Sequence, residues 1–151
     1  MKNLITVFAF SILSLVTIAQ TGTVTTAFYQ EKGVAIKGYD PVAFFTEKKA
    51  MVGDQHIIFD WSGSQWRFIS KENLELFKIN PEKYAPQYGG YCAYGVSENH
   101  KSPTDPNAWT VVGNKLYLNY SLKVKELWST DIPGRINKAD ANWKALVKES
   151  N

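Results

Sequence analysis

Cysteine is almost absent from this chain of 151 residues, which contains one, Cys92. A single thiol excludes an internal disulfide and every zinc or iron–sulfur motif that needs several cysteines. Neither sign of charge is in large excess, since the chain has 17 Lys and Arg and 14 Asp and Glu, and no basic block. Nucleic-acid binding needs basic residues clustered on one face, so no nucleic-acid partner is expected. No phosphate loop, Ser/His/Asp motif or paired-carboxylate motif can be recognised, which argues against a hydrolase.

A long apolar run occurs at the start of the chain. Residues 4–18 carry no charge, follow a positive Lys2, and lead into Thr17-Ile18-Ala19. This is the pattern of a secretory signal peptide cleaved near Ala19, and the run is short for a spanning helix, which needs about 20 residues. We therefore expect 1–19 to be a signal peptide, the protein to be exported (periplasmic or secreted), and no membrane span to remain after cleavage. The alternative is an uncleaved N-terminal anchor.

The rest of the chain has the length of one domain and 14% aromatic residues. We expect a flexible lead-in at 20–32 and one domain at 33–149. Alternating patterns predict a hairpin at 56–61 and 65–69, and a second at 109–112 and 115–118. A serine-capped helix follows each hairpin, and a last amphipathic helix follows Asp131. The predicted class is α+β: small antiparallel hairpins packed with short helices, plus a C-terminal amphipathic helix.

Further expectations concern individual positions. Asp40 and Asp105, each before a proline, are predicted to cap helices. The helix after Ser70 is expected to bury one face, made by Leu74, Leu76 and Phe77. The last helix is expected to bury a stripe of Ile136, Ala139, Trp143, Leu146 and Val147.

The two hairpin–helix units have similar spacing. Gly63 lies seven residues before Ser70 and Phe77 seven after it, while Gly113 lies eight before Ser121 and Trp128 seven after it. Two explanations stay open. The chain contains an internal duplication, or both units follow the simplest way to build a β-β-α motif.

The segment 85–108 shows no period and holds Cys92, His100 and several tyrosines. A segment of this length without a period is usually functional or disordered, and its aromatic content argues against disorder. A Cys/His/carboxylate set formed with Asp105 could ligate copper or zinc, or His100 could act as base to the thiol. Tyr88, Tyr91 and Trp109 are candidate walls of a ligand site. The plain alternatives are a buried, inert cysteine and aromatics packed in the core.

Several stretches resemble the YHS-domain family. They are 36–45 (IKGYDPVAFF), 66–70, 80–84 (NPEKY), 86–93 (PQYGGYCA), 105–109 (DPNAW), 115–119 (KLYLN) and 140–143 (DANW). The resemblance covers residues 34–143 and is nearest to the exported, extended subgroup of that family. It implies a YHS-like fold for 33–149.

The resemblance also bears on metal binding and on Cys92. Metal-binding members carry cysteines at the positions of Ala43, Ile69 and Asn73, so their thiolate site is absent here. In the extended subgroup the cysteine of Gly-Gly-Tyr-Cys-Ala is a marked position, and some similar proteins carry selenocysteine there. This implies redox or nucleophilic use of Cys92, which we expect to be partly sheltered yet reachable.

Three functions follow as hypotheses. The first is a ligand- or metal-binding site centred on Cys92, with His100 as a second ligand and copper or zinc as the metal. The second is a thiol-dependent oxidoreductase in which Cys92 works with an external thiol, for example that of a reducing partner protein. The third is a structural interaction domain.

Overall fold

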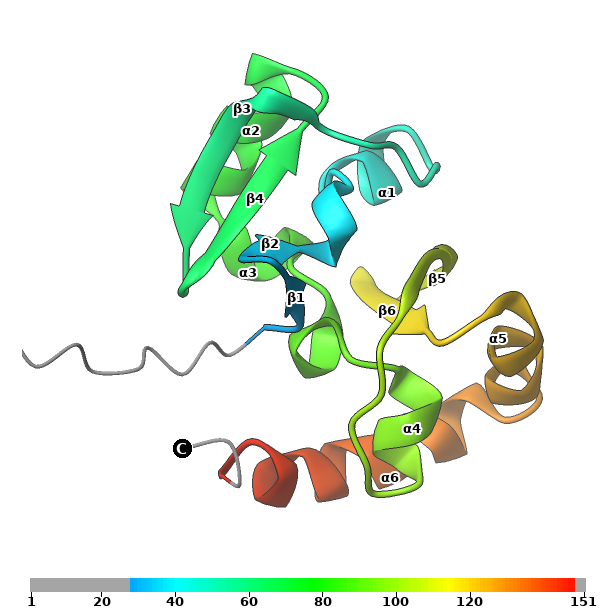
Figure 1. The fold of residues 1–151 in the computed structure, drawn as a ribbon. Coiled ribbons are helices and arrows are strands. Elements are labelled where there is room, and N and C mark those ends of the chain that lie inside the picture. The colour runs from blue at the N-terminus through cyan, green and yellow to red at the C-terminus, as the bar shows by residue number, and fades with distance from the viewer. Residues whose placement is uncertain (1–27, 149–151) are drawn as a thin grey trace, which may run out of the picture.

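The computed structural model describes residues 28–148, and these form a mixed α+β fold of small sheets and short helices (Figure 1). The predicted fold class is confirmed at this level. The proposed signal peptide, 1–19, lies outside the described residues. Within 28–148, no helix has the length and apolar character needed to cross a membrane.

The first half, residues 28–84, contains four strands, a 3-10 helix and three α-helices. They are β1 (Gln30–Glu31), β2 (Val34–Ala35), η1 (Ile36–Gly38), α1 (Ala43–Thr46), β3 (Asp54–Trp61), β4 (Ser64–Phe68), α2 (Lys71–Ile79) and α3 (Pro81–Tyr84). One sheet has the order β1-β2-β4-β3, in which β2 runs parallel to β4 and the other neighbours are antiparallel. β1 lies in the segment that the sequence assigns to a flexible lead-in, so that prediction fails for Gln30 and Glu31.

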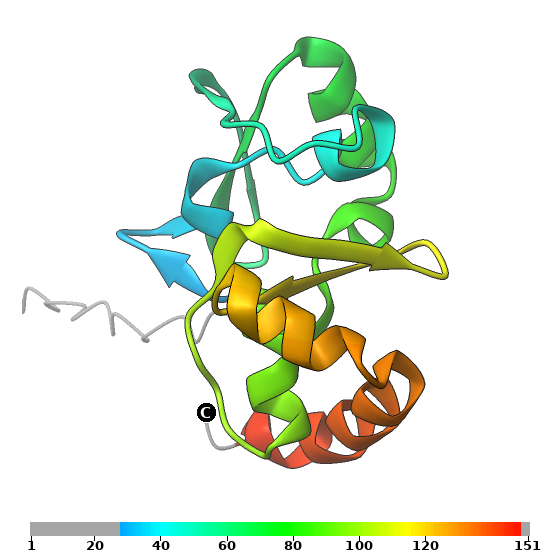
Figure 2. The same cartoon turned by 90° about the vertical axis from the view of Figure 1, so that its right-hand side faces the viewer.

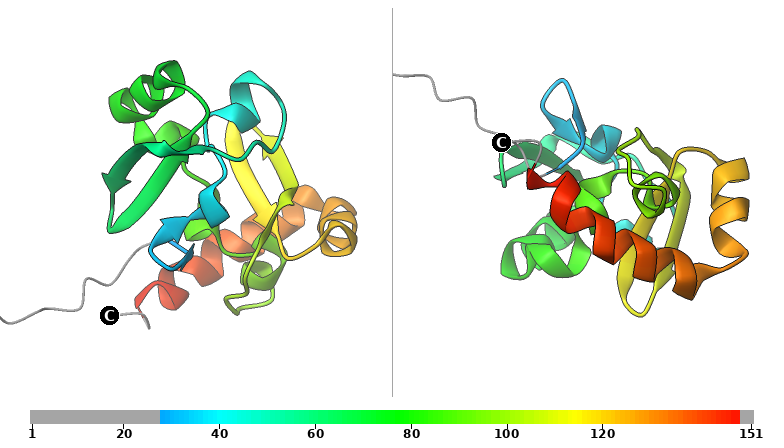
Figure 3. Two further views of the ribbon diagram at one scale, coloured as in Figure 1. Left: turned by 45° about the horizontal axis from the view of Figure 1, so that its top comes forward. Right: turned by 90° about the horizontal axis from the view of Figure 1, so that it is seen from below.

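The second half, residues 85–148, contains a two-stranded sheet and four helical segments. They are η2 (Gln87–Gly90), α4 (Ala93–Ser97), β5 (Asp105–Val112), β6 (Lys115–Asn119), α5 (Leu122–Ser129) and α6 (Ile132–Leu146). β5 and β6 pair antiparallel. Seen from below, α6 lies across the underside of the molecule (Figure 3). It is tied to α4 because Asn142 Nδ2 donates to the carbonyls of Val96 at 3.0 Å and Ser97 at 3.2 Å.

The ends of the elements follow local chemistry. Both hairpin turns have two residues in the left-handed region, at Ser62-Gly63 and Gly113-Asn114, and such turns match the twist of paired strands. The hydroxyls of Ser70 and Ser121 cap α2 and α5 by accepting from the third residue on. Both predicted hairpins and both serine caps are confirmed.

The buried apolar residues form two clusters, which meet at the β5–β6 hairpin. The first is centred on Trp66, Phe68 and Phe77, and the second on Trp128 and Ala139. Leu116 and Leu118 of β6 belong to the first cluster, while Tyr117 between them belongs to the second, because successive side chains of a strand point to opposite faces. Figure 2 shows the hairpin between the first half above and helices α4–α6 below.

The two halves repeat one arrangement of elements. Each has a 3-10 turn, a short helix, a hairpin and a serine-capped helix: η1, α1, β3, β4, α2 and then η2, α4, β5, β6, α5. Three consecutive left-handed residues occur in each turn, at 36–38 and at 88–90. Each run ends in a glycine, which is followed by a tyrosine and then by Asp40 in the first half and Cys92 in the second. Asp40 and Cys92 therefore occupy equivalent positions, which supports the internal duplication.

Some local predictions are wrong. Leu76 is 39% exposed, so only Leu74 and Phe77 of the three predicted positions pack inward on α2. Asp105 caps no helix; it begins β5, and its carboxylate accepts from the backbone N–H of Asn107 at 2.9 Å. Asp40 is not the N-cap residue of α1, which is Val42, but its carboxylate does accept from the backbone N–H groups of Val42 and Ala43 at the start of that helix.

Candidate functional site

Cys92 lies at the junction between η2 and α4. It is the N-cap residue of α4, and its backbone N–H donates to the Ser102 carbonyl at 3.0 Å. The side chain is 2% exposed, so the thiol is more enclosed than the expected partly sheltered position. The cause is the packing of α4 against the end of β6, which closes over the sulfur.

The sulfur of Cys92 meets donors and an acceptor at once. The backbone N–H groups of Gly95 and Tyr120 both donate to Sγ, at 3.4 and 3.2 Å. The thiol lies 3.8 Å from Asn119 Oδ1, to which its S–H donates. Since a thiolate can only accept and a thiol can also donate, the surroundings offer a hydrogen-bond partner to both protonation states.

Asn119 is the polar side chain nearest to this chemistry. It is fully buried, and its Oδ1 accepts from the backbone N–H of Tyr94 at 3.1 Å. Its amide nitrogen, Nδ2, has no hydrogen-bond partner. A buried donor without a partner is uncommon and calls for an explanation. An amide N–H is thus available beside the thiol.

The equivalent position in the first half holds the carboxyl group of Asp40. Asp40 is fully buried, and its Oδ1 accepts from the N–H groups of Val42 and Ala43 at the start of α1. Its Oδ2 accepts from the N–H of Ile69 and from Asn73 Nδ2, both at 2.8 Å. Ile69 and Tyr120 each precede the serine that caps the next helix. Backbone donors from a helix start and from a strand end converge on Asp40 and on Cys92 alike.

His100 lies 3.4 Å from the Glu98 carbonyl through its Nδ1, and no hydrogen bond joins it to Cys92 among the described residues. The exposed imidazole folds back onto α4, where a Cβ on Gly95 would sit 3.2 Å from His100 Nε2. Within 28–148, no group of three or more His, Cys, Asp and Glu side chains could hold a metal ion. A protein zinc site uses three or four such ligands, so the donors around Cys92 do not fit the metal hypothesis.

Tyr88 and Tyr91 both pack against Trp143 of α6. Their ring centroids lie 6.0 and 6.2 Å from that of Trp143. The Tyr88 hydroxyl donates to Asp140 at 2.8 Å. Burial, and then this hydrogen bond to a carboxylate, raise the pKa of Tyr88 far above its usual range. These two tyrosines join η2 to α6 and so support the turn that carries Cys92.

Trp109 lies apart from the thiol. Its ring packs against Phe44 of α1, with centroids 5.4 Å apart, and it lines a cleft between α1 and α5. The sequence analysis placed Trp109 in the wall of a Cys92 site, whereas the structure places it against α1. Gly95, Asn119 and Tyr120, which contact the sulfur, were missed. The repeated Gly-Tyr at 38–39 and 90–91, aligned with Ser70 and Ser121, is the signal that could have identified them.

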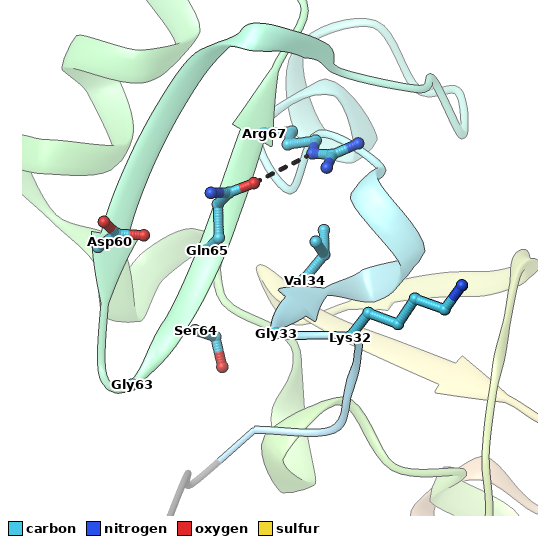
Figure 4. A pocket seen from close by; sticks show the side chains of 8 residues that line it. All are labelled: Lys32, Gly33, Val34, Asp60, Gly63, Ser64, Gln65 and Arg67. Carbon is cyan, nitrogen blue, oxygen red and sulfur yellow. Dashed lines mark hydrogen bonds between the residues drawn. The ribbon is translucent and has the colours of Figure 1, made fainter. Parts of the chain in front are cut away.

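A second cavity, of about 520 Å³, lies beside β4 and is mostly polar (Figure 4). Arg67 is joined to Gln65 at 3.4 Å, and Asp60 lies across β4 from Lys32 and Arg67 (Figure 4). The Ser64 side chain points away from Arg67. Because these charged groups do not converge on one point, the Cys92 site remains the candidate functional site.

Comparison with known proteins found no matching family model, no matching curated protein and no matching solved structure.

Proposed function

We propose that this chain is an exported, YHS-like protein that performs thiol-dependent oxidation and reduction at Cys92. The observation that carries the proposal is the pair of backbone N–H groups, from Gly95 and Tyr120, that point at Sγ. Hydrogen bonds to the charged form favour that form, and the thiolate is the nucleophile in cysteine chemistry. The resemblance to family members with selenocysteine at this position supports the same role.

The burial of Cys92 favours a small oxidant over a protein disulfide in the first step. We infer a hydroperoxide. The thiolate attacks the terminal oxygen, an S–O bond forms and the O–O bond breaks, and the leaving oxygen takes a proton from water. The sulfur becomes a sulfenic acid and the peroxide becomes water or an alcohol. The unpartnered Asn119 Nδ2 is a donor available to the oxygen that the sulfur has gained.

Reduction needs thiols from outside, because the chain has no second cysteine. A first external thiol condenses with the sulfenic acid, releases water and leaves a mixed disulfide. A second thiolate attacks the outer sulfur, releases the Cys92 thiolate and forms the external disulfide. A small thiol or a reducing partner protein fills this role.

The test is the rate at which hydroperoxide oxidises Cys92, followed by intact mass and by trapping the sulfenic acid. We expect the folded protein to react at least about tenfold faster than the same chain in urea, because the two donors are lost on unfolding. Asn119→Asp keeps the acceptor for Tyr94 but sets a negative charge beside the sulfur, so it should slow the reaction. Asn114→Asp, in the exposed hairpin turn, makes the same chemical change and should leave the rate unaltered.

Two results would contradict the proposal. One is a folded thiol that reacts no faster than the unfolded chain. The other is stoichiometric copper or zinc in the purified protein that is lost in Cys92→Ser and in His100→Ala, which would restore the metal-binding hypothesis.

A further inference from the structure

A cleft on the other side of the β5–β6 hairpin is separate from the Cys92 site. It has a volume of about 620 Å³ and lies between α1, β5 and α5. Figure 2 looks onto this side, with α1 above, β5 across the middle and α5 in front. Cavities of about 300–1,000 Å³ are the usual size of small-molecule sites. The volume is therefore enough for a small organic ligand.

The walls of the cleft are largely aromatic and aliphatic. Phe44 and Phe45 come from α1, and Trp109 and Val111 come from β5. The Trp109 ring is held by its contact with Phe44, 5.4 Å between centroids, and stays partly exposed. An aromatic ring that is held in place and partly exposed offers a surface on which a flat ligand can stack.

The charge at the cleft is of one sign. Lys48 and Lys125 line it, and none of the residues that line it is acidic. Lys125 Nζ lies 5.9 Å over the Trp109 ring. The salt bridges found within 28–148 involve neither lysine. Neither ammonium group is therefore paired with a carboxylate of the described residues, and both can attract an anion beside the apolar wall.

Lys48 also holds an unfavourable backbone conformation. Its φ is +52°, in the left-handed region where a lysine is strained and a glycine is not. A glycine at this position would relieve the strain, but it would remove the charge from the cleft. The strain and the charge can therefore be separated by substitution.

From this combination we propose that the cleft binds a small aromatic carboxylate. The ring stacks on Trp109 and packs against Phe45 and Val111, while the carboxylate faces Lys48 and Lys125. A phosphate ester fits less well, because its more strongly hydrated dianion would face mostly apolar walls and no arginine. This site is independent of the chemistry proposed for Cys92.

The experiment is a titration of the full protein with phenylacetate, followed by two-dimensional 15N–1H NMR. Phenylacetamide, which has the same ring and no charge, serves as the matched probe. We expect saturable shifts in the amides of 109–111 and of α1, with phenylacetamide binding at least about fivefold more weakly. Cys92→Ala should bind phenylacetate as the unaltered protein does, so failure of the redox proposal would not affect this result.

Variants identify the groups responsible. Lys125→Gln and Lys48→Gln should each weaken phenylacetate binding about fivefold and leave phenylacetamide unchanged. Lys123→Gln, on the same helix but away from the cleft, should change neither. Lys48→Gly should weaken binding while keeping or raising the melting temperature, which separates binding from folding. Equal affinity for the two probes, shifts outside the cleft, or no binding up to the solubility of phenylacetate would overturn the proposal.

Discussion

The Tyr88 hydroxyl makes a hydrogen bond that joins two distant parts of the chain. It donates to Asp140, 52 positions later, and so fastens η2 to α6. Burial and this hydrogen bond raise the pKa of Tyr88, and burial raises that of Tyr117 beside it. A tyrosine with a raised pKa holds its proton in the folded protein at a pH where the unfolded chain has lost it. Folding stability therefore falls as the pH rises above the ordinary tyrosine pKa, near 10.

We predict that Tyr88→Phe makes the protein less sensitive to alkaline pH. At neutral pH the variant should lose about 1 kcal/mol, the value of one hydrogen bond. Between about pH 9.5 and 11.5 its stability should fall less steeply than that of the unaltered protein. A slope should remain, because Tyr117 and Tyr29 have raised pKa values as well, with that of Tyr29 raised to about 12. Urea unfolding at a series of pH values measures this, and Tyr120→Phe, at a ring that is 57% exposed, is the control.

The central residue of the site could be predicted from the sequence, but the residues that contact it could not. Cys92 was identified from its glycine-rich setting and from the family resemblance. Asn119 and Tyr120 could not be identified, because they lie 27 and 28 positions after Cys92 at the end of β6. Only the way the β5–β6 hairpin packs brings them to the sulfur. Trp109 was misplaced for the same reason, since it follows Cys92 in sequence but faces α1. Local chemistry is visible in a sequence, whereas pairing register is not.

Asp40 holds several elements of the first half together. One carboxylate oxygen serves the start of α1, and the other serves Ile69, at the end of β4, and Asn73 of α2. Every partner is a donor, so the site requires a group that only accepts. The fold of this half therefore depends on one buried side chain that accepts hydrogen bonds at both of its oxygens.

Asp40→Asn should therefore destabilise the protein by about 2–4 kcal/mol, although the two side chains have nearly the same shape. The new NH₂ group must face two donors, at Ile69 N–H and Asn73 Nδ2, and neither can accept. Thermal unfolding followed by circular dichroism measures the change. Asp60→Asn, on the exposed surface of β3, should stay within about 0.5 kcal/mol of the unaltered protein. Similar melting temperatures for the two variants would show that the Asp40 contacts contribute little.

Elements with strong local signals were predicted, and those without were missed. The two hairpins have left-handed turns and alternating strands, and their following helices have serine caps. α4 was missed because Ala93–Ser97 is five residues long and contains a glycine, too short to show a helical period. The short strand β2 was anticipated from Val34-Ala35-Ile36. β1 was missed because it is two residues long and exists through its pairing with β2.

Both hydrophobic clusters depend on the same hairpin. Leu116 and Leu118 pack into the first cluster and Tyr117 into the second. A strand whose two faces are both buried couples the packing on one side to the packing on the other. We therefore expect the two halves to unfold together, in one transition.

Leu118→Ala tests this coupling. Leu118 is 1% exposed, and the cavity should cost about 2–5 kcal/mol. Near-ultraviolet circular dichroism and hydrogen exchange in both halves should still report one midpoint, lowered for both. Leu76→Ala, at a side chain that is 39% exposed, should cost less than about 1 kcal/mol. Loss of the first half at a lower denaturant concentration than the second would contradict the coupling.

The equivalence of Asp40 and Cys92 places two different acceptors at corresponding positions of the two halves. A carboxylate is not oxidised by peroxide, so the contacts of Asp40 are the same under oxidising and reducing conditions. Under the chemistry proposed for Cys92, an oxygen added to its sulfur would alter the contacts of the second half alone. The first half would then keep its architecture while the second half responds to oxidants.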